Sequence, residues 1–361
     1  MKKIILALFT MLFAGVSVFA QSDLQVLAVV KYNKSESVTV KQLKKRVGYY
    51  EKQLNKKLSV DERKEVLNTL IEEKLVVQAA QKSGFAIPDS VINQYFEANL
   101  SQLVGAPVTE KQFEELVKSN FGLTVDEFFT QQLGLTKNEF KENLKTQLIM
   151  QQYVVSMNQA ELQNIAPNDT DIRMFYESNK GSFIWNDMAK MLIVSAPKDG
   201  NGNAAKVKLN ELRNKLKDKK ITPEQLKIQS KADNSGFIAG EGIVEKSQRG
   251  SQMLGISMKD LLGLFSQNIG FVSDIIESSE GYSFISIIKK YDAKMLSLSD
   301  LMQPETTITV YDYIRAGLTQ QLQGEFLQKA LEDLAEELNT SANVDRKKTG
   351  ASLDKLLDWG D

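Results

Sequence analysis

Residues 67–80 of this 361-residue chain read LNTLIEEKLVVQAA, and the segments before and after them can be interpreted from this starting point. The apolar positions of this stretch recur at spacings of three and four residues, while Glu72, Glu73 and Lys74 fall on the opposite side. Such a period is that of an amphipathic α-helix with one buried face. The same pattern runs with few interruptions from Lys41 to about Ala166. We therefore expect a helical N-terminal region.

Punctuation residues divide this region into separate helices. Leu24–Val30 is a short strand-like run, and Ser37–Val40 after it fits either a second strand or the entry to a helix. Thr39 is expected to cap a helix that begins near Lys41, because a threonine side chain there accepts a free backbone N–H. Further helix starts and breaks are expected at Ser59, Pro88, Pro107, Thr109, Thr136 and Pro167.

The composition changes after Asn168, where short apolar runs begin to alternate with helical patterns. Met188–Val194 is a compact strand candidate. Phe271–Glu277 and Tyr282–Ile288, separated by a polar turn, predict a β-hairpin. Residues 185–292 are therefore interpreted as a compact α+β domain.

Helical character returns after Leu298, and Val310–Leu338 carries an apolar stripe over an unusually long segment. The small α+β domain is a poor partner for so long a stripe, so we expect this helix to fold back on the N-terminal helices. The predicted fold class is mainly α, with a discontinuous helical domain interrupted by the α+β insertion. The predicted boundaries are a signal peptide at 1–20, helical residues 21–184, the insertion at 185–292, the returning segment at 293–345 and a polar, mobile tail at 346–361.

The N-terminus has the three parts of a cleavable export signal. Lys2 and Lys3 precede an apolar run, Ile4–Val16, that is too short to span a bilayer. Val18, Phe19 and Ala20 then offer the small or permissive side chains that a signal peptidase reads. We expect cleavage before Gln21 and no membrane span in the mature protein.

Two missing residue types restrict the chemistry. The chain has no cysteine, which excludes a lipid anchor on cysteine, disulfides, thiolate metal sites and cysteine nucleophiles. It has no histidine, which excludes a Ser-His-Asp triad and imidazole metal ligands. A formal net charge of −1 and a pI near 5.9 disfavour nucleic-acid binding. No glycine motif for nucleotides occurs, so we expect no nucleotide cofactor. Without cysteine and histidine we expect no metal site either.

In this organisation the chain resembles the SurA/PrsA family of exported foldases. Residues 67–80 match the family's signature helix, of the form L-x-x-L-I-x-x-K-L-x-x-Q-x-A, and Ser83–Asp89 matches the helix stop and start that follow it. The resemblance implies that the helical part is a chaperone module and that the partners are unfolded polypeptides. It also implies an envelope address: the periplasm of a two-membrane bacterium, with secretion from a one-membrane cell as the alternative.

The insertion resembles a parvulin-type prolyl isomerase domain. Ala189–Val194 stands in place of the family's opening strand A-R-H-I-L-V, and Gly270–Ser273 with Gly281–Ile285 stands in place of its closing turn and strand. Met191 and Ser283 occupy the two positions where the family places histidines. Methionine cannot donate a hydrogen bond and serine is shorter than an imidazole, so the resemblance implies a degenerate site without catalytic residues.

Two further positions bear on that site. Asp233 falls where the family often has a polar residue, although an aspartate in a water-exposed loop is the more ordinary interpretation. The aromatic residue of the family's proline pocket falls near Asp260 or Leu261. A carboxylate in a pocket wall is costly without a partner, so Asp260 there would argue against isomerase activity, and Leu261 would weaken that argument.

Chaperone binding calls for exposed, adaptable apolar side chains. The candidates for client contact are aromatic residues and methionines of the N-terminal helices, with two residues of the insertion: Tyr95, Phe96, Phe113, Phe121, Phe128, Phe129, Met150, Tyr153, Met157, Leu261 and Phe265. The alternative is that most of them are core. The leading functional hypothesis is a periplasmic chaperone for outer-membrane or secreted proteins in transit. An active parvulin-type isomerase and a non-catalytic envelope scaffold are the alternatives.

Overall fold

A computed structural model describes residues 23–198 and 203–359 of the chain. The predicted signal peptide, residues 1–20, lies outside the described residues. The chain divides into two compact units, each built from its own cores. The helical unit comprises residues up to Ile165 together with those from Gln321 onward, and the sheet unit comprises Ala166–Gln320. No helix in the described ranges is long and apolar enough to cross a membrane.

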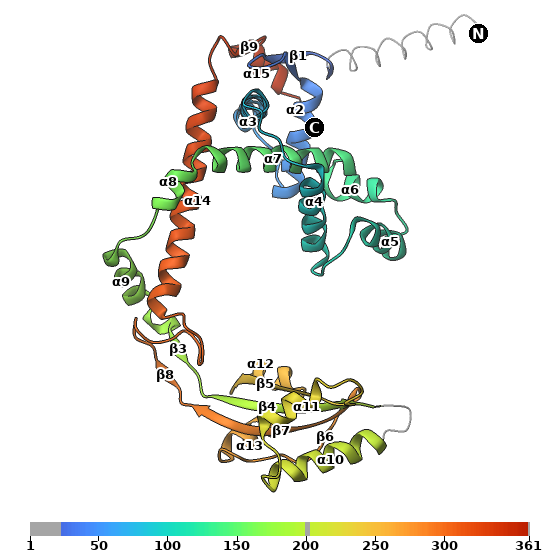
Figure 1. Cartoon of the computed structure of the whole chain (residues 1–361). Coiled ribbons are helices and arrows are strands. Elements are labelled where there is room, and N and C mark those ends of the chain that lie inside the picture. The colour runs from blue at the N-terminus through green and yellow to red at the C-terminus, as the bar shows by residue number, and fades with distance from the viewer. Residues whose placement is uncertain (1–22, 199–202, 360–361) are drawn as a thin grey trace, which may run out of the picture. The chain divides into compact units, whose positions relative to one another are not determined.

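The helical unit contains three short strands and a series of helices (Figure 1). Its elements are β1 (Val26–Val30), β2 (Glu36–Thr39), α2 (Val40–Leu54), α3 (Val60–Lys82), α4 (Asp89–Val104), α5 (Glu110–Phe121), α6 (Val125–Leu133), α7 (Lys137–Met157), α8 (Gln159–Asn164), the C-terminal part of α14 (Val310–Leu338), β9 (Val344–Arg346) and α15 (Gly350–Leu357).

Capping explains where these helices begin. Thr39, Ser59, Thr109 and Thr136 each accept a hydrogen bond from the third helical N–H, and the Gln or Glu at that third position bonds back to the cap. These capping boxes satisfy backbone donors that the helix itself leaves free. The four predicted helix starts are confirmed.

The strands of the helical unit form one small sheet in the order β2-β1-β9, with both pairings antiparallel. The signature helix is α3, and its buried Gln78 fixes this sheet to it: Gln78 Oε1 accepts the N–H of Asn33, in the β1–β2 turn, at 2.9 Å. Leu75 and Ala79 lie in the same core as β1. The periodicity of residues 67–80 therefore packs the hairpin and the helix together.

The returning helix has the bounds that the sequence predicts, Val310–Leu338. Its last turns join the core of the helical unit through Ala335 and Leu338. Earlier in the same helix, the Gln323 amide donates to the carbonyl of Leu162, in α8, at 2.9 Å.

The C-terminal segment is ordered secondary structure, and the prediction of a mobile tail from residue 346 is wrong. Leu357 of α15 is 0% exposed and lies in the main core. The buried Arg63 guanidinium donates to the carbonyls of Leu357 at 2.8 Å and Trp359 at 3.1 Å, and lies 4.7 Å from the Trp359 ring centroid. The apolar face of α15 and this cation–π contact outweigh the polar composition of the segment.

The sheet unit consists of a twisted antiparallel sheet covered on both faces, with further short elements before and after it (Figure 1). Its elements are α9 (Asp169–Ser178), η1 (Lys180–Ser182), β3 (Ile184–Trp185), β4 (Met188–Pro197), α10 (Asn203–Lys217), α11 (Pro223–Ser230), β5 (Ile238–Glu245), α12 (Gln248–Leu254), α13 (Met258–Ser266), β6 (Ile276–Glu277), β7 (Gly281–Tyr291), β8 (Lys294–Met295) and the N-terminal part of α14.

The four main strands follow the order β5-β4-β7-β6. Helices α10 and α11 pack on one face through Leu209 and Leu226, and α13 packs on the other through Leu261 and Leu264. The predicted hairpin is confirmed in its pairing, since β6 pairs with β7 and Val272 bridges to Ser286. The fold class, mainly α with an α+β insertion, is confirmed.

Candidate client-binding surface

The structure separates the predicted client-contact residues by burial. Five of them are core and cannot touch a client in this fold, which is the alternative that the sequence leaves open: Phe96, Phe113, Phe129, Tyr153 and Leu261. Four are half-buried: Tyr95, Phe128, Met150 and Phe265. Phe121 is 60% exposed and Met157 is 53% exposed. Only the last two present most of a large apolar side chain to solvent.

The buried phenylalanines form a separate small core within α4–α7. Phe129 stacks on Phe140 with ring centroids 5.0 Å apart, and Phe113 lies 5.9 Å from Phe129. Short helices such as α5 and α6 have little other apolar surface, so large rings are needed to hold them together. Phe121 extends this cluster outward, with its ring 5.3 Å from that of Phe128. Its exposed edge continues a packed aromatic surface.

Met157 lies in a groove between the C-terminal end of α7 and the C-terminal half of α14. The cavity there has a volume of about 360 Å³. Its apolar lining is Val154, Met157, Phe326, Ala330 and Leu334, and its rim carries Asn158, Lys329, Asp333 and Glu337. Apolar walls with a rim of mixed charge contact varied side chains without requiring one particular charge. We call this the α7–α14 groove.

Sequence reasoning placed Phe326 and Leu334 only in the helical stripe of α14 and missed them as groove residues. The available signal was the length of that stripe. The main core takes Ala335 and Leu338 of this helix, and Leu331 and Leu334 pack partly against it. Phe326 and Ala330 precede these residues, are not among them, and line the groove.

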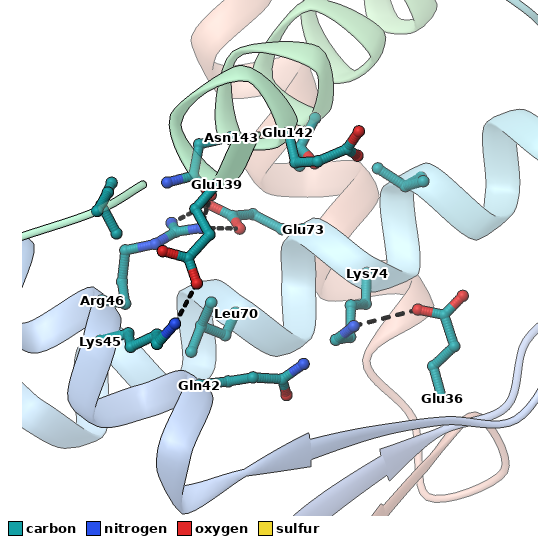
Figure 2. Close-up of a pocket in the computed structure, with 13 residues that line it drawn as sticks. Glu36, Gln42, Lys45, Arg46, Leu70, Glu73, Lys74, Glu139, Glu142 and Asn143 are labelled. Carbon is teal, nitrogen blue, oxygen red and sulfur yellow. Dashed lines mark hydrogen bonds and ion pairs between the residues drawn. The ribbon is translucent and has the colours of Figure 1, made fainter. Parts of the chain in front are cut away.

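A second, polar cavity of about 460 Å³ lies among α2, α3 and α7 (Figure 2). Arg46 and Glu73 form a two-point ion pair across it, at 2.6 and 2.9 Å, and Arg46 also donates to Asn143 at 3.3 Å. Burial alone would lower the pKa of Arg46, but the Glu73 carboxylate outweighs burial and raises it. This pair is therefore charged and mutually satisfied.

Two further ion pairs line this cavity. Lys74 binds Glu36 at 3.1 Å, and Lys45 binds Glu139. Burial works against ionisation of both glutamates, but their lysine partners outweigh it and lower the pKa of each. Within each ion pair, the two opposite charges neutralise each other inside the helical unit. We interpret the cavity as a structural junction of three helices, and sequence reasoning did not find it.

In the sheet unit, the two histidine-replacing positions do not form a pair. Met191 is opposite Ile287 across β4 and β7, whereas Ser283 is opposite Ser195. The two positions are four residues apart along the strands, roughly 13 Å at the usual rise. Met191 is fully buried in an apolar core with Val244, Leu261 and Ile285. A polar cluster centred on Met191 would have to displace that core.

The remaining degenerate positions are water-exposed or paired. Asp233 is exposed in the loop after α11. Asp260 is exposed in the first turn of α13, where its carboxylate accepts from the Ser257 hydroxyl at 2.6 Å. Asp260 therefore does not enter a pocket wall, and Leu261 is core. Glu241, between the two glycines of β5, pairs with Lys227 at 2.8 Å and Lys190 at 3.1 Å.

Comparisons with known proteins find sequence relatives that are named foldases. No protein-family model matches the chain. The sequence is 25% identical over 264 residues to the foldase protein PrsA of Clostridium kluyveri, covering 73% of this chain and 71% of that protein. It is 23% identical over 292 residues to PrsA of Clostridium botulinum strain Okra, covering 80% and 74%.

Among solved structures, the chain is similar to one from a study of two Campylobacter jejuni proteins, the virulence factor PEB4 and the periplasmic protein Cj1289. Those two proteins are described as structurally related SurA-like chaperones. That similarity has 18% identity and a TM-score of 0.33 over 90% of this chain and 99% of the other. The chain is related in sequence to proteins named PrsA foldases over most of its length.

Proposed function

We propose that this SurA/PrsA-like chain is an envelope chaperone that binds unfolded outer-membrane or secreted polypeptides in transit, after export to the periplasm without a lipid anchor. The observation that carries the proposal is the relatedness to foldases over 73% of the chain. The expected signal peptide at residues 1–20 and the absence of cysteine support the address.

The α7–α14 groove is the proposed client site of the helical unit. Met157 contributes a flexible, polarizable side chain that adapts to different partners. Phe326 contributes a rigid apolar surface opposite it. The charged rim residues include both signs, so the groove excludes few sequences by charge alone. Promiscuous binding of exposed apolar segments follows from this combination.

The sheet unit is proposed to have no prolyl isomerase activity. Isomerisation has to lower a barrier of about 18–20 kcal/mol by favouring the twisted amide over the planar one. Met191 offers no hydrogen-bond donor, and its neighbours in the core are apolar. Ser283 lies too far along the sheet to supply one there. We propose that this unit is a second polypeptide-binding surface.

The test combines two assays on the mature chain. Aggregation of an unfolded outer-membrane protein is followed by light scattering, and isomerisation of a prolyl peptide is followed in parallel. The groove variant is Met157→Asp with Phe326→Asp, and the matched control is Met174→Asp, since Met174 is an exposed methionine of α9 with 57% exposure.

We expect the wild type and the Met174 control to suppress aggregation, the groove variant to suppress it poorly, and none to catalyse isomerisation. Isomerase activity without suppression would instead support the enzyme alternative. Absence of both activities would support the scaffold alternative and contradict the proposal.

A further inference from the structure

Strand β5 is an edge strand of the four-stranded sheet, paired only with β4 (Figure 1). Its register continues to Lys246, whose N–H donates to the carbonyl of Asp187 at 2.8 Å. In an antiparallel ladder, hydrogen-bonded and non-hydrogen-bonded pairs alternate. Counting back from Lys246, the backbone groups of Ala239, Glu241 and Ile243 point away from β4.

These outward-facing backbone groups are unoccupied within residues 23–198 and 203–359. The backbone hydrogen bonds outside regular ladders include none to Ala239, Glu241 or Ile243. The outer side of β7, in contrast, is occupied, because Ile285 and Ile287 there bond to Ser273 and Phe271. Edge strands with free backbone groups are templates for pairing with another chain, and many proteins block them with proline or bulges. β5 has no proline and its register with β4 is regular.

A cavity with both apolar and polar walls lies at the C-terminal end of this edge. It has a volume of about 340 Å³, and its apolar lining includes Trp185, Met188, Ile243, Met253 and Met302. Met253 is 58% exposed, so part of this lining is open to solvent. Three methionines and a tryptophan make a pocket that adapts to aliphatic and aromatic side chains alike.

The two charged residues at the cavity differ in whether they already have bonding partners. The Glu245 carboxylate accepts hydrogen bonds from Asn186 and, at 3.0 Å, from Ser247. Arg249 also lines the cavity and is exposed, and within the part of the chain that the structure describes its guanidinium has no carboxylate partner. The uncommitted charge of this site is therefore positive, which complements an acidic side chain in a ligand.

We propose that the sheet unit binds an extended segment of an unfolded polypeptide as an added strand on β5, with an apolar side chain in the methionine-lined cavity and a nearby acidic side chain paired with Arg249. Strand addition takes its affinity from the main chain and its selectivity from pockets for alternate side chains. Gly240 and Gly242 leave the strand without bulk on one face. This inference rests on the proposed function and specifies the polypeptide that the second surface takes.

The two tryptophans of the chain permit a direct binding assay. Trp359 belongs to the helical unit, so Trp359→Phe leaves Trp185, in the cavity lining, as the only tryptophan reporter. The ligand is a short β-prone peptide with alternating apolar residues and one glutamate. A second peptide carries lysine in place of that glutamate. Two more peptides are N-methylated on alternate residues, one at the odd positions and one at the even positions. Only one of these two phases removes the N–H groups that would face β5.

We expect the glutamate peptide to shift Trp185 emission saturably. The lysine peptide should bind roughly two- to fivefold more weakly, in keeping with the strength of an exposed ion pair. One N-methylation phase should weaken binding about tenfold or more through lost main-chain hydrogen bonds, and the other should change it little. Arg249→Glu should reverse the preference between the glutamate and lysine peptides, and because Arg249 is exposed the variant should fold.

Equal loss with both N-methylation phases, or an unchanged peptide preference in Arg249→Glu, would overturn strand addition at β5. Suppression of client aggregation by the same protein separates the two proposals. If suppression through the α7–α14 groove persists while Trp185 gives no response, this inference fails and the proposed function stands. If suppression is absent, the proposed function fails by itself.

Discussion

The docking of α15 can be tested through one leucine. Leu357 is 0% exposed and lies in the main core of the helical unit. Leu357→Ala should therefore lower the free energy of unfolding of that unit by about 2–5 kcal/mol, the usual range for a buried leucine. At a urea dependence of about 1–3 kcal/mol per molar, the midpoint should fall by about 0.7–5 M. The docking of α15 can itself contribute less free energy than this expected loss. In that case α15 detaches before the unit unfolds, and the measured decrease in the free energy of unfolding equals the docking free energy of α15.

The assay uses the Trp185→Phe background, in which Trp359 is the remaining tryptophan. Trp359 lies against Arg63 and reports whether the C-terminal segment is docked. Lys355→Ala is the control, because Lys355 is an exposed residue of the same helix. The reasoning is refuted if Trp359 of the parent protein emits like an indole in water and Leu357→Ala changes neither its spectrum nor its urea midpoint.

Three further results are expected. Acid should destabilise the helical unit, because the pKa values of Glu36 and Glu139 are lowered in the fold. Their ion pairs therefore stabilise the unit above pH 4.5, the ordinary glutamate pKa, and this stabilisation is lost as the pH falls below that value. Urea titrations at neutral and acid pH measure the difference. Gly250→Ala places a Cβ 2.0 Å from the backbone oxygen of Glu245, so the sheet unit should lose about 1–3 kcal/mol or more in thermal unfolding followed at Trp185. Thr39→Ala removes the cap of α2 and should cost the helical unit about 1 kcal/mol in urea unfolding.

Local signals in the sequence predict local structure well. The capping residues Ser59 and Thr136 begin their helices as predicted, because the pattern of a capping box lies within four consecutive residues. The bounds of α14 follow from an uninterrupted apolar stripe. The apolar residues of α15 also recur at three- and four-residue spacing, as Leu353, Leu356 and Leu357, but charged neighbours hid them.

Long-range packing was not predictable from these signals. Phe129 and Phe121 are the same residue type eight positions apart, yet one is fully buried and the other mostly exposed. Their burial depends on which helix faces them, and a single sequence does not specify that. The register of β4 against β7 is equally non-local, so the motif match put Met191 and Ser283 in one site although the strands place them four residues apart.

Client binding in the α7–α14 groove can be tested by locating a bound client on the helical unit. A photoreactive phenylalanine analogue is placed singly at Met157 and Phe326 in the α7–α14 groove, and as controls at Met174 and at Glu332, an exposed position of α14. The mature protein is illuminated with an unfolded outer-membrane protein. We expect crosslinks from the two groove positions and few from the controls. Equal crosslinking at all four positions, or crosslinks from the controls alone, would contradict it.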